Sequence, residues 1–188
     1  MKTKQLFRAA LAAFCVLVMT SLMTGCKEKN DPVVEEPQTE NRTPVAAFMD
    51  YAYSTTDEMI KVFDITVEYY DSEGNVQTET LTTATWAKSA KSASLPAKFG
   101  MNVKIAFKEN IDVDNLPLMA LEYECSYKSS ALDAQNVAVG KQVADAFHGK
   151  AEFAGKKIAV WVDSYAKHPV QFLHQFDAKG VATSIAWE

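Results

Sequence analysis

Few side chains in this sequence have the type and spacing needed for catalysis or metal binding. The three histidines, His148, His168 and His174, form no His-x-His or His-x-x-x-His pair of the kind that brings two imidazoles to one zinc ion. No serine lies in a Gly-x-Ser-x-Gly elbow, and no glycine-rich phosphate loop occurs. We therefore expect neither a catalytic centre nor a cofactor. His174 shares its predicted strand face with Phe172 and Phe176, so we interpret it as a core residue.

A group of oxygen-bearing side chains lies between two strongly predicted strands. Glu109, Asp112, Asp114 and Asn115 fall in one short stretch, and oxygen ligands at alternate positions can collect a calcium ion. The stretch lacks the glycine and the distal glutamate of an EF-hand. We expect a solvated acidic loop, with Asp112 and Asp114 as calcium candidates in the alternative.

Aromatic side chains suggest a binding surface, because tyrosine and tryptophan rings can stack on sugars. Most of the aromatic residues alternate with polar ones and are expected to enter the core. Tyr70 and Tyr165 lie opposite the apolar faces of their predicted strands, and Trp161 has the parity of Tyr165. These three residues are our ligand-binding candidates, with a glycan as the candidate ligand.

The N-terminal residues have the pattern of a leader. A basic start, Lys2 to Arg8, precedes an apolar run from Ala9 to Met23. This run is shorter than the roughly 20 residues of a spanning helix and is typical of a signal peptide. It ends in Leu22-Met23-Thr24-Gly25-Cys26. Residues 1–26 resemble the signal peptide of bacterial lipoproteins, whose lipobox has the form Leu-x-x-Gly-Cys.

This resemblance implies that residues 1–25 are removed and that Cys26 carries lipid on its sulfur. Lipoproteins of this family bear two or three acyl chains, and each buried methylene contributes about 0.8 kcal/mol of membrane affinity, so the anchor would be permanent. Lys27 stands where an aspartate retains many lipoproteins at the inner membrane. The charged residues 27–31 are similar to those of surface lipoproteins in Gram-negative gut anaerobes. We expect a protein anchored in the outer membrane and exposed on the cell surface, with a periplasm-facing one as the alternative.

Cysteine use excludes an intrachain disulfide from the mature chain. Cys15 lies in the leader and Cys26 takes the lipid, which leaves Cys125 alone. The domain must then be held by its hydrophobic core, and we expect Cys125 to be buried in it. Loss of the leader, with its three basic residues and no acid, takes the formal net charge from −5 to −8. That sign disfavours nucleic acid as a partner.

A polar tether precedes the predicted domain. Residues 26–44 carry three prolines and five acidic side chains, and Val33 and Val34 are almost the only apolar ones. Such a segment cannot bury enough surface to offset the entropy of ordering. We expect it to be disordered, and we expect residues 45–188 to form one domain.

From Val45 onward apolar and polar residues alternate, which is the period of a β-strand. The predicted inward faces are Phe63, Ile65, Val67 and Tyr69; Phe99, Met101, Val103, Ile105 and Phe107; Met119, Leu121, Tyr123, Cys125 and Tyr127; Val170, Phe172, His174 and Phe176; and Val181, Thr183, Ile185 and Trp187. Ile158, Val160 and Val162 predict a further strand, and the threonines from 78 to 85 predict one that ends at Trp86. Hairpin turns are predicted at Asp71 to Asn75 and at Asp177 to Gly180.

One stretch departs from this alternation. Val139, Val143 and Phe147 recur every four residues, and Gly149 follows where a C-cap glycine would stand. We therefore expect one short helix within residues 134–148.

The regular strands predict an all-β fold, an antiparallel β-sandwich of immunoglobulin-like architecture. The alternative is an eight-stranded lipocalin-like barrel. In a barrel, four inward-facing residues would line a ligand cavity: Met101, Met119, Phe172 and Phe176.

These features favour a lipid-anchored envelope protein with a non-enzymatic role in binding, adhesion or assembly, whose partner is a glycan or another protein. A lipocalin-like carrier of a small apolar ligand is the second interpretation. An enzyme that acts on glycans is the third. It needs two carboxylates about 5 to 9.5 Å apart, and the sequence offers no basis for choosing them.

Overall fold

Nine strands and two α-helices make up the part of the chain that the structure describes. The computed structural model describes residues 42–187, so the predicted leader, Cys26 and most of the predicted tether lie outside it. The strands are β1 (Ala46–Thr55), β2 (Phe63–Tyr70), β3 (Val76–Thr80), β4 (Thr85–Lys91), β5 (Ala97–Phe107), β6 (Met119–Leu132), β7 (Ala138–Phe153), β8 (Gln171–Phe176) and β9 (Ala182–Ile185). The helices are α2 (Asp57–Val62) and α3 (Lys156–Lys167), and a 3-10 turn spans Val113–Asn115.

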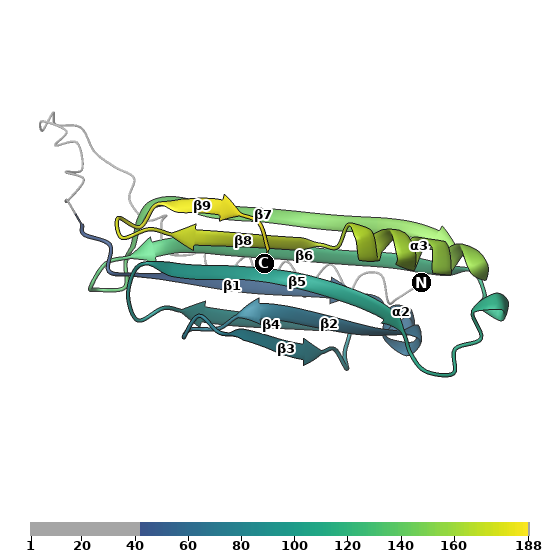
Figure 1. Ribbon diagram of the computed structural model, residues 1–188. Helices are drawn as coiled ribbons and strands as arrows, with labels where there is room; N and C mark the ends of the chain where they lie inside the picture. The colour runs from purple at the N-terminus through teal and green to yellow at the C-terminus, as the bar shows by residue number, and fades with distance from the viewer. Residues whose placement is uncertain (1–41, 188) are drawn as a thin grey trace, which may run out of the picture. The chain divides into compact units, whose positions relative to one another are not determined.

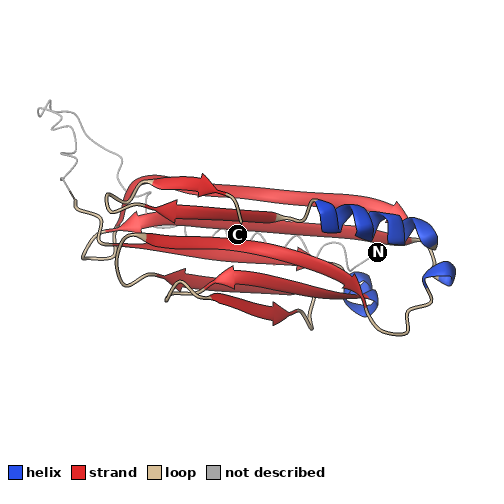
Figure 2. Cartoon of the chain, viewed as in Figure 1, coloured by secondary structure: helices blue, strands red, loops and turns tan. Residues whose placement is uncertain are grey.

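The strands form two antiparallel sheets that pack face to face (Figures 1 and 2). The four-stranded sheet has the order β4-β1-β6-β7, and the five-stranded sheet has the order β3-β2-β5-β8-β9. The predicted all-β, antiparallel sandwich is therefore confirmed. It shares with immunoglobulin domains the two packed antiparallel layers, whereas its strand order is different.

The core lies between the sheets, where the alternating side chains predicted it. On β5, Phe99, Met101 and Val103 are fully buried, while Lys104 is exposed on the other face. The two layers meet through aromatic rings: Phe172 of β8 stacks on Tyr127 of β6, with ring centroids 4.0 Å apart. Burial of these faces is the main stabilising contribution, and Cys125, the cysteine within residues 42–187, is free.

The alternative of a closed barrel is wrong. Each sheet ends in unpaired edge strands, β4 and β7 in one and β3 and β9 in the other, so the described strands leave both sheets open. The four residues that a barrel would place around a ligand cavity are buried in the packed core instead: Met101, Met119, Phe172 and Phe176. The side chains of the two layers fill the space that a lipocalin-like carrier would need.

Three hairpins end in the same five-residue turn at one end of the sandwich, on the left in Figure 1. Each turn begins with an aspartate, Asp71, Asp133 or Asp177. The aspartate Oδ1 accepts hydrogen bonds from the backbone N–H groups two and four residues later, at 2.8–2.9 Å. The fourth residue has positive φ, at Gly74, Asn136 and Gly180, which closes a tight hairpin with a bulge.

The central turn of these three explains why the predicted helix at 134–148 is wrong. Asp133 and Asn136 reverse the chain there, and the next residues form strand β7. A spacing of four keeps residues on one face of a strand as well as of a helix, so Val143 and Phe147 both face inward from β7. Because β7 is an edge strand, its inner face is only half covered and the alternation is weak.

Two strand predictions also need correction. Residues 158–162 belong to helix α3, in which Ile158, Val162 and Tyr165 are buried while Val160 is 68% exposed. Spacings of four and three place those three residues on one helical face. The threonine-rich run is two strands rather than one, because β3 ends at Thr80 in one sheet and β4 begins at Thr85 in the other.

Candidate functional site

The structure separates the three predicted ligand-binding residues. Tyr70 lies at the end of β2, whereas Trp161 and Tyr165 lie on α3. The ring of Trp161 packs on Phe63, 6.2 Å away between centroids, and on Tyr165, 5.5 Å away. The expectation of an exposed ring is wrong at Tyr165, which is 6% exposed.

Tyr165 has a structural role in the described fold. Its hydroxyl accepts a hydrogen bond from the backbone N–H of Val170 at 3.4 Å, and its ring meets Tyr123 edge-on at 5.7 Å. Burial raises the pKa of Tyr165 well above its usual range. This side chain therefore fastens α3 to the end of the sandwich.

Tyr70 contributes to an apolar row on the outer face of the five-stranded sheet. Tyr69, Met101 and Phe172 belong to the core between the sheets, so by strand alternation their neighbours Tyr70, Gly100 and Leu173 face outward. Leu173 is only 1% exposed, so this side chain is covered on the outer face. The register extends the row to both sheet edges, because Tyr70 pairs with Val76 and Leu173 pairs with Ile185.

Trp187 completes this row from the segment that follows β9. Its ring meets the Tyr70 ring edge-on, with centroids 5.4 Å apart and planes at 70°. Both side chains are half-buried. The predicted inward face of the last strand, Val181, Thr183, Ile185 and Trp187, is wrong, because Ile185 pairs with the outward-facing Leu173 and Val181 is 57% exposed. Since β9 ends at Ile185, Trp187 can cross back over the outer face of the sheet.

A polar row runs beside the aromatic pair on the same face. Glu68 of β2 pairs in register with Asn102 of β5, which pairs in turn with Gln171 of β8. The Asn102 side-chain N–H group donates to Glu68 Oε2 at 2.9 Å, and the Lys104 ammonium forms an ion pair with Glu68 Oε1. Asn102 is 6% exposed, and its Oδ1 has no hydrogen-bond partner among residues 42–187.

These two rows form what we call the aromatic face: Glu68, Tyr70, Asn102, Gln171 and Trp187. Its composition suits a ring that is apolar on one side and carries hydroxyl groups around its edge. Aromatic rings can cover the C–H side of such a ring, and planar amide and carboxylate groups can bond its hydroxyls. Binding sites commonly combine an apolar surface with a few placed polar groups in this way.

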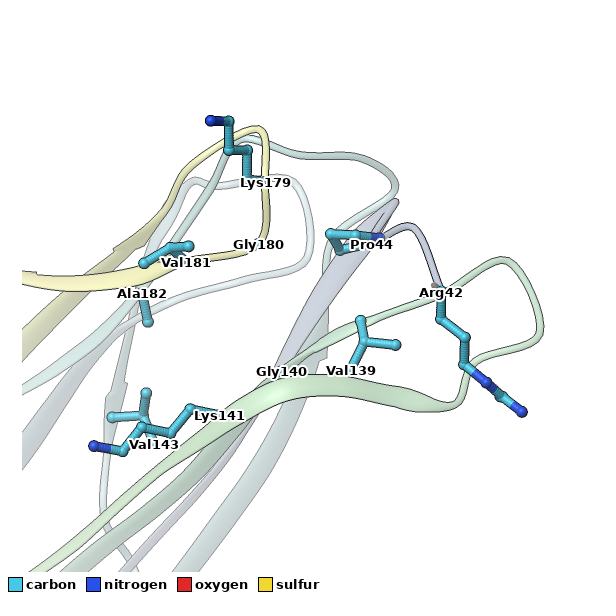
Figure 3. Close-up of a pocket in the computed structure, with 10 residues that line it drawn as sticks. All are labelled: Arg42, Pro44, Val139, Gly140, Lys141, Val143, Lys179, Gly180, Val181 and Ala182. Atoms are coloured by element: carbon cyan, nitrogen blue, oxygen red, sulfur yellow. The ribbon is translucent and has the colours of Figure 1, made fainter. Parts of the chain in front are cut away.

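A separate groove of about 300 Å³ lies at the turn end of the sandwich, between β7 and the β8–β9 hairpin (Figure 3). Its walls are the side chains of Val139 and Val143 on one side and Val181 and Ala182 on the other, with Pro44 at one end. Three basic residues contribute to its lining, and no acidic residue does: Arg42, Lys141 and Lys179.

A second hollow, of about 420 Å³, lies between the Asp71 turn and residues 92–98. Its polar groups are largely used within the fold. The Asp71 carboxylate closes its own turn, Ser72 Oγ accepts from the N–H of Lys91, and Ser92 Oγ bonds the backbone of Ala47. These bonds hold the loops together, and Ser94, Lys98 and Gln175 are further polar residues of the lining.

The acidic stretch predicted as a calcium alternative behaves as a solvated loop. Asp112 Oδ2 accepts from the side-chain amide of Asn115 at 2.8 Å, and Asp114 pairs with Lys156 at 3.4 Å. Both carboxylates are on exposed residues. Throughout residues 42–187 no group of three or more His, Cys, Asp or Glu side chains could hold a metal ion.

Two nucleophilic or titratable side chains are buried, as predicted. His174 Nε2 lies 2.9 Å from the Tyr127 hydroxyl and Nδ1 lies 3.3 Å from Ser184 Oγ. Burial lowers the pKa of His174, so the ring stays neutral at neutral pH. Cys125 is fully buried, and burial raises its pKa to about 12, which keeps it as an unreactive thiol.

Comparison with protein-family models, with curated proteins and with solved structures found no match to this chain. None of the helices in the described part of the chain has the length and apolar content needed to span a membrane.

Proposed function

We propose that this chain is an envelope protein, anchored in the outer membrane through lipid on Cys26, whose β-sandwich binds a ligand without chemical turnover. The lipobox-like sequence at residues 22–26 and the polar tether that follows support the anchor. Lys27 and the charged residues after it support a surface-exposed orientation, with a periplasm-facing domain as the alternative.

The aromatic face is the observation that carries the binding proposal. Tyr70 and Trp187 present paired rings beside Glu68, Asn102 and Gln171, and this combination favours a glycan over another protein as the partner. The carboxylate on this face argues for binding rather than hydrolysis. A glycosidase uses a pair of carboxyl groups, whereas the aromatic face as defined above holds Glu68 alone, and Glu68 already bonds Asn102 and Lys104.

Replacing Cys26 with serine tests the anchor. Serine has no sulfur to acylate, so we expect Cys26→Ser to move the protein from the membrane fraction to the soluble fraction, because each lost methylene removes about 0.8 kcal/mol of membrane affinity. Mass spectrometry of the wild-type chain should show a lipid-modified first residue at 26. An unmodified Cys26 thiol, or a retained leader, would contradict the anchor.

Protease added to intact cells tests the orientation. Digestion of the sandwich in intact cells supports surface exposure, and protection until the outer membrane is opened supports the periplasmic alternative.

Removing either ring of the aromatic face tests the binding proposal. On an array of bacterial and host polysaccharides, we expect the wild-type chain to bind at least one glycan. Tyr70→Ala and Trp187→Ala should each weaken that binding about tenfold, which is 1.4 kcal/mol. Val160→Ala, an apolar truncation on the exposed face of α3 and away from the aromatic face, should leave binding unchanged. If both variants bound the glycan as strongly as the wild-type chain does, the glycan site would lie outside the aromatic face.

A further inference from the structure

The groove between β7 and the β8–β9 hairpin exists because β7 departs from regular pairing with β6. Ser129 pairs with Val143, but Ala131 pairs with Val139, so residues 140–142 have no register partner on β6. Gly140 adopts φ +75°, and open space surrounds the position where a Cβ would stand. Such bulges re-aim side chains and recur beside binding sites.

The wall of the groove opposite β7, formed by the β8–β9 hairpin, is short. β9 ends at Ile185 while β7 continues as a long edge strand, so the hairpin covers only the first part of the inner face of β7. Val181 stays 57% exposed at the start of this wall, and Ala182 and Val143 both lie beside the space between the two strands (Figure 3). An apolar surface has thereby been left uncovered within a concave site.

The charge around this groove is opposite to that of the whole chain. The chain has a formal net charge of −5, yet the groove is lined by basic side chains and by no acid. Arg42 pairs with Asp133 at 3.0 Å. Lys141 and Lys179 are exposed and form no ion pair with any residue from 42 to 187.

From these observations we propose that the groove binds a small anionic amphiphile, a carboxylate on a short apolar chain. The apolar chain of the ligand would pack against Val139, Val143, Val181 and Ala182. Its carboxylate would be attracted by Lys141 and Lys179. The volume of about 300 Å³ is at the lower end of ligand pockets, which fits a short chain. The bulge removes the regular free edge that an added peptide strand would need. This site is separate from the aromatic face and does not depend on it.

Titration with sodium octanoate tests the proposal. The mature-length chain should carry Cys26→Ser, so that no acyl group or detergent competes. We expect saturable changes in amide NMR shifts that are confined to residues 139–143 and 179–182. Octanol and octyltrimethylammonium, which have the same alkyl chain but no negative charge, should bind at least tenfold more weakly than octanoate. Acetate, which keeps only the charge, should leave the shifts unchanged.

Paired variants separate the charge and the shape of the groove. Lys141→Glu with Lys179→Glu should weaken octanoate binding at least tenfold, whereas Lys61→Glu with Lys157→Glu, an equal charge change elsewhere, should not. Val143→Trp should fill the groove and abolish the shift changes, with its fold checked by the unchanged spectrum of the distant α3. Equal binding of octanol, shifts spread over other surfaces, or binding of polyglutamate in place of octanoate would each overturn the proposal.

Discussion

Replacing Phe172 with alanine is expected to destabilise the domain by about 3–5 kcal/mol, the usual cost of removing a large buried aromatic side chain. Phe172 connects the two sheets. Its ring stacks on Tyr127 at 4.0 Å, lies 6.4 Å from both Tyr51 and Phe147, and lies 5.9 Å from His174. Domains of this size are stable by about 5–15 kcal/mol, so much of that margin would be lost.

The same substitution at Phe147 is the matched control for this prediction. Phe147 belongs to the same ring cluster but lies on the edge strand β7 and is half-buried. We expect Phe147→Ala to lower the free energy of unfolding by about half as much, because the substitution removes less buried surface and the edge strand β7 can relax around it. Urea unfolding followed by fluorescence measures both values. Equal losses for the two variants would show that the cluster does not join the layers at Phe172.

Where apolar and polar residues alternate regularly, the sequence correctly predicted which side chains face the core. On β2, β5, β6 and β8 the inward faces are those that the period of two indicates, from Phe63 to Phe176. The central strands are covered on their inner face by the opposite sheet, so burial is complete there and the pattern is strong. The edge strand β7 shows why the rest could not be predicted, since a half-covered face tolerates alanine and polar residues in either parity.

The missed turn at Asp133 to Val137 carried a usable signal. Two turns of the form Asp-x-x-Gly were predicted, at Asp71 and Asp177. The third has Asn136 in place of glycine, and asparagine also tolerates positive φ. Considered beside the other two, Asp133 and Asn136 would have predicted a hairpin there and removed the helix.

The candidate site was only partly accessible from sequence, because a face is assembled from several strands. Tyr70 could be assigned to an outer face by its parity on β2. Its partner Trp187 lies 117 positions later in the printed sequence, and nothing local indicates that the chain turns back after Ile185. The groove at Lys141 and Lys179 likewise depends on a bulge in β7 and on the short β9. Neither feature can be recognised from the spacing of apolar residues.

Adding a single methyl group at Gly100 is the second substitution with a large expected effect. A Cβ there would lie 2.4 Å from the Phe172 carbonyl oxygen and 2.9 Å from the Leu173 Cα, so the obstacle is the backbone of β8. Backbone in a paired sheet cannot rotate away, and Gly100→Ala must push β8 from β5 at the centre of the five-stranded sheet.

We expect Gly100→Ala to cost about 3 kcal/mol, the upper part of the range for overpacking. Gly149→Ala is the matched control, since its Cβ would also lie 2.4 Å from its nearest neighbour, but that neighbour is the ring of Tyr123. A side chain can move where a strand cannot, so the control should cost only about 1 kcal/mol. Thermal unfolding of the two variants measures the difference. Since β8 also holds Gln171 of the aromatic face and its neighbour Leu173, Gly100→Ala should weaken glycan binding as well, while Gly149→Ala on the other sheet should not. Equal destabilisation by the two substitutions would mean that β8 can move away from β5 as easily as a tyrosine ring can turn.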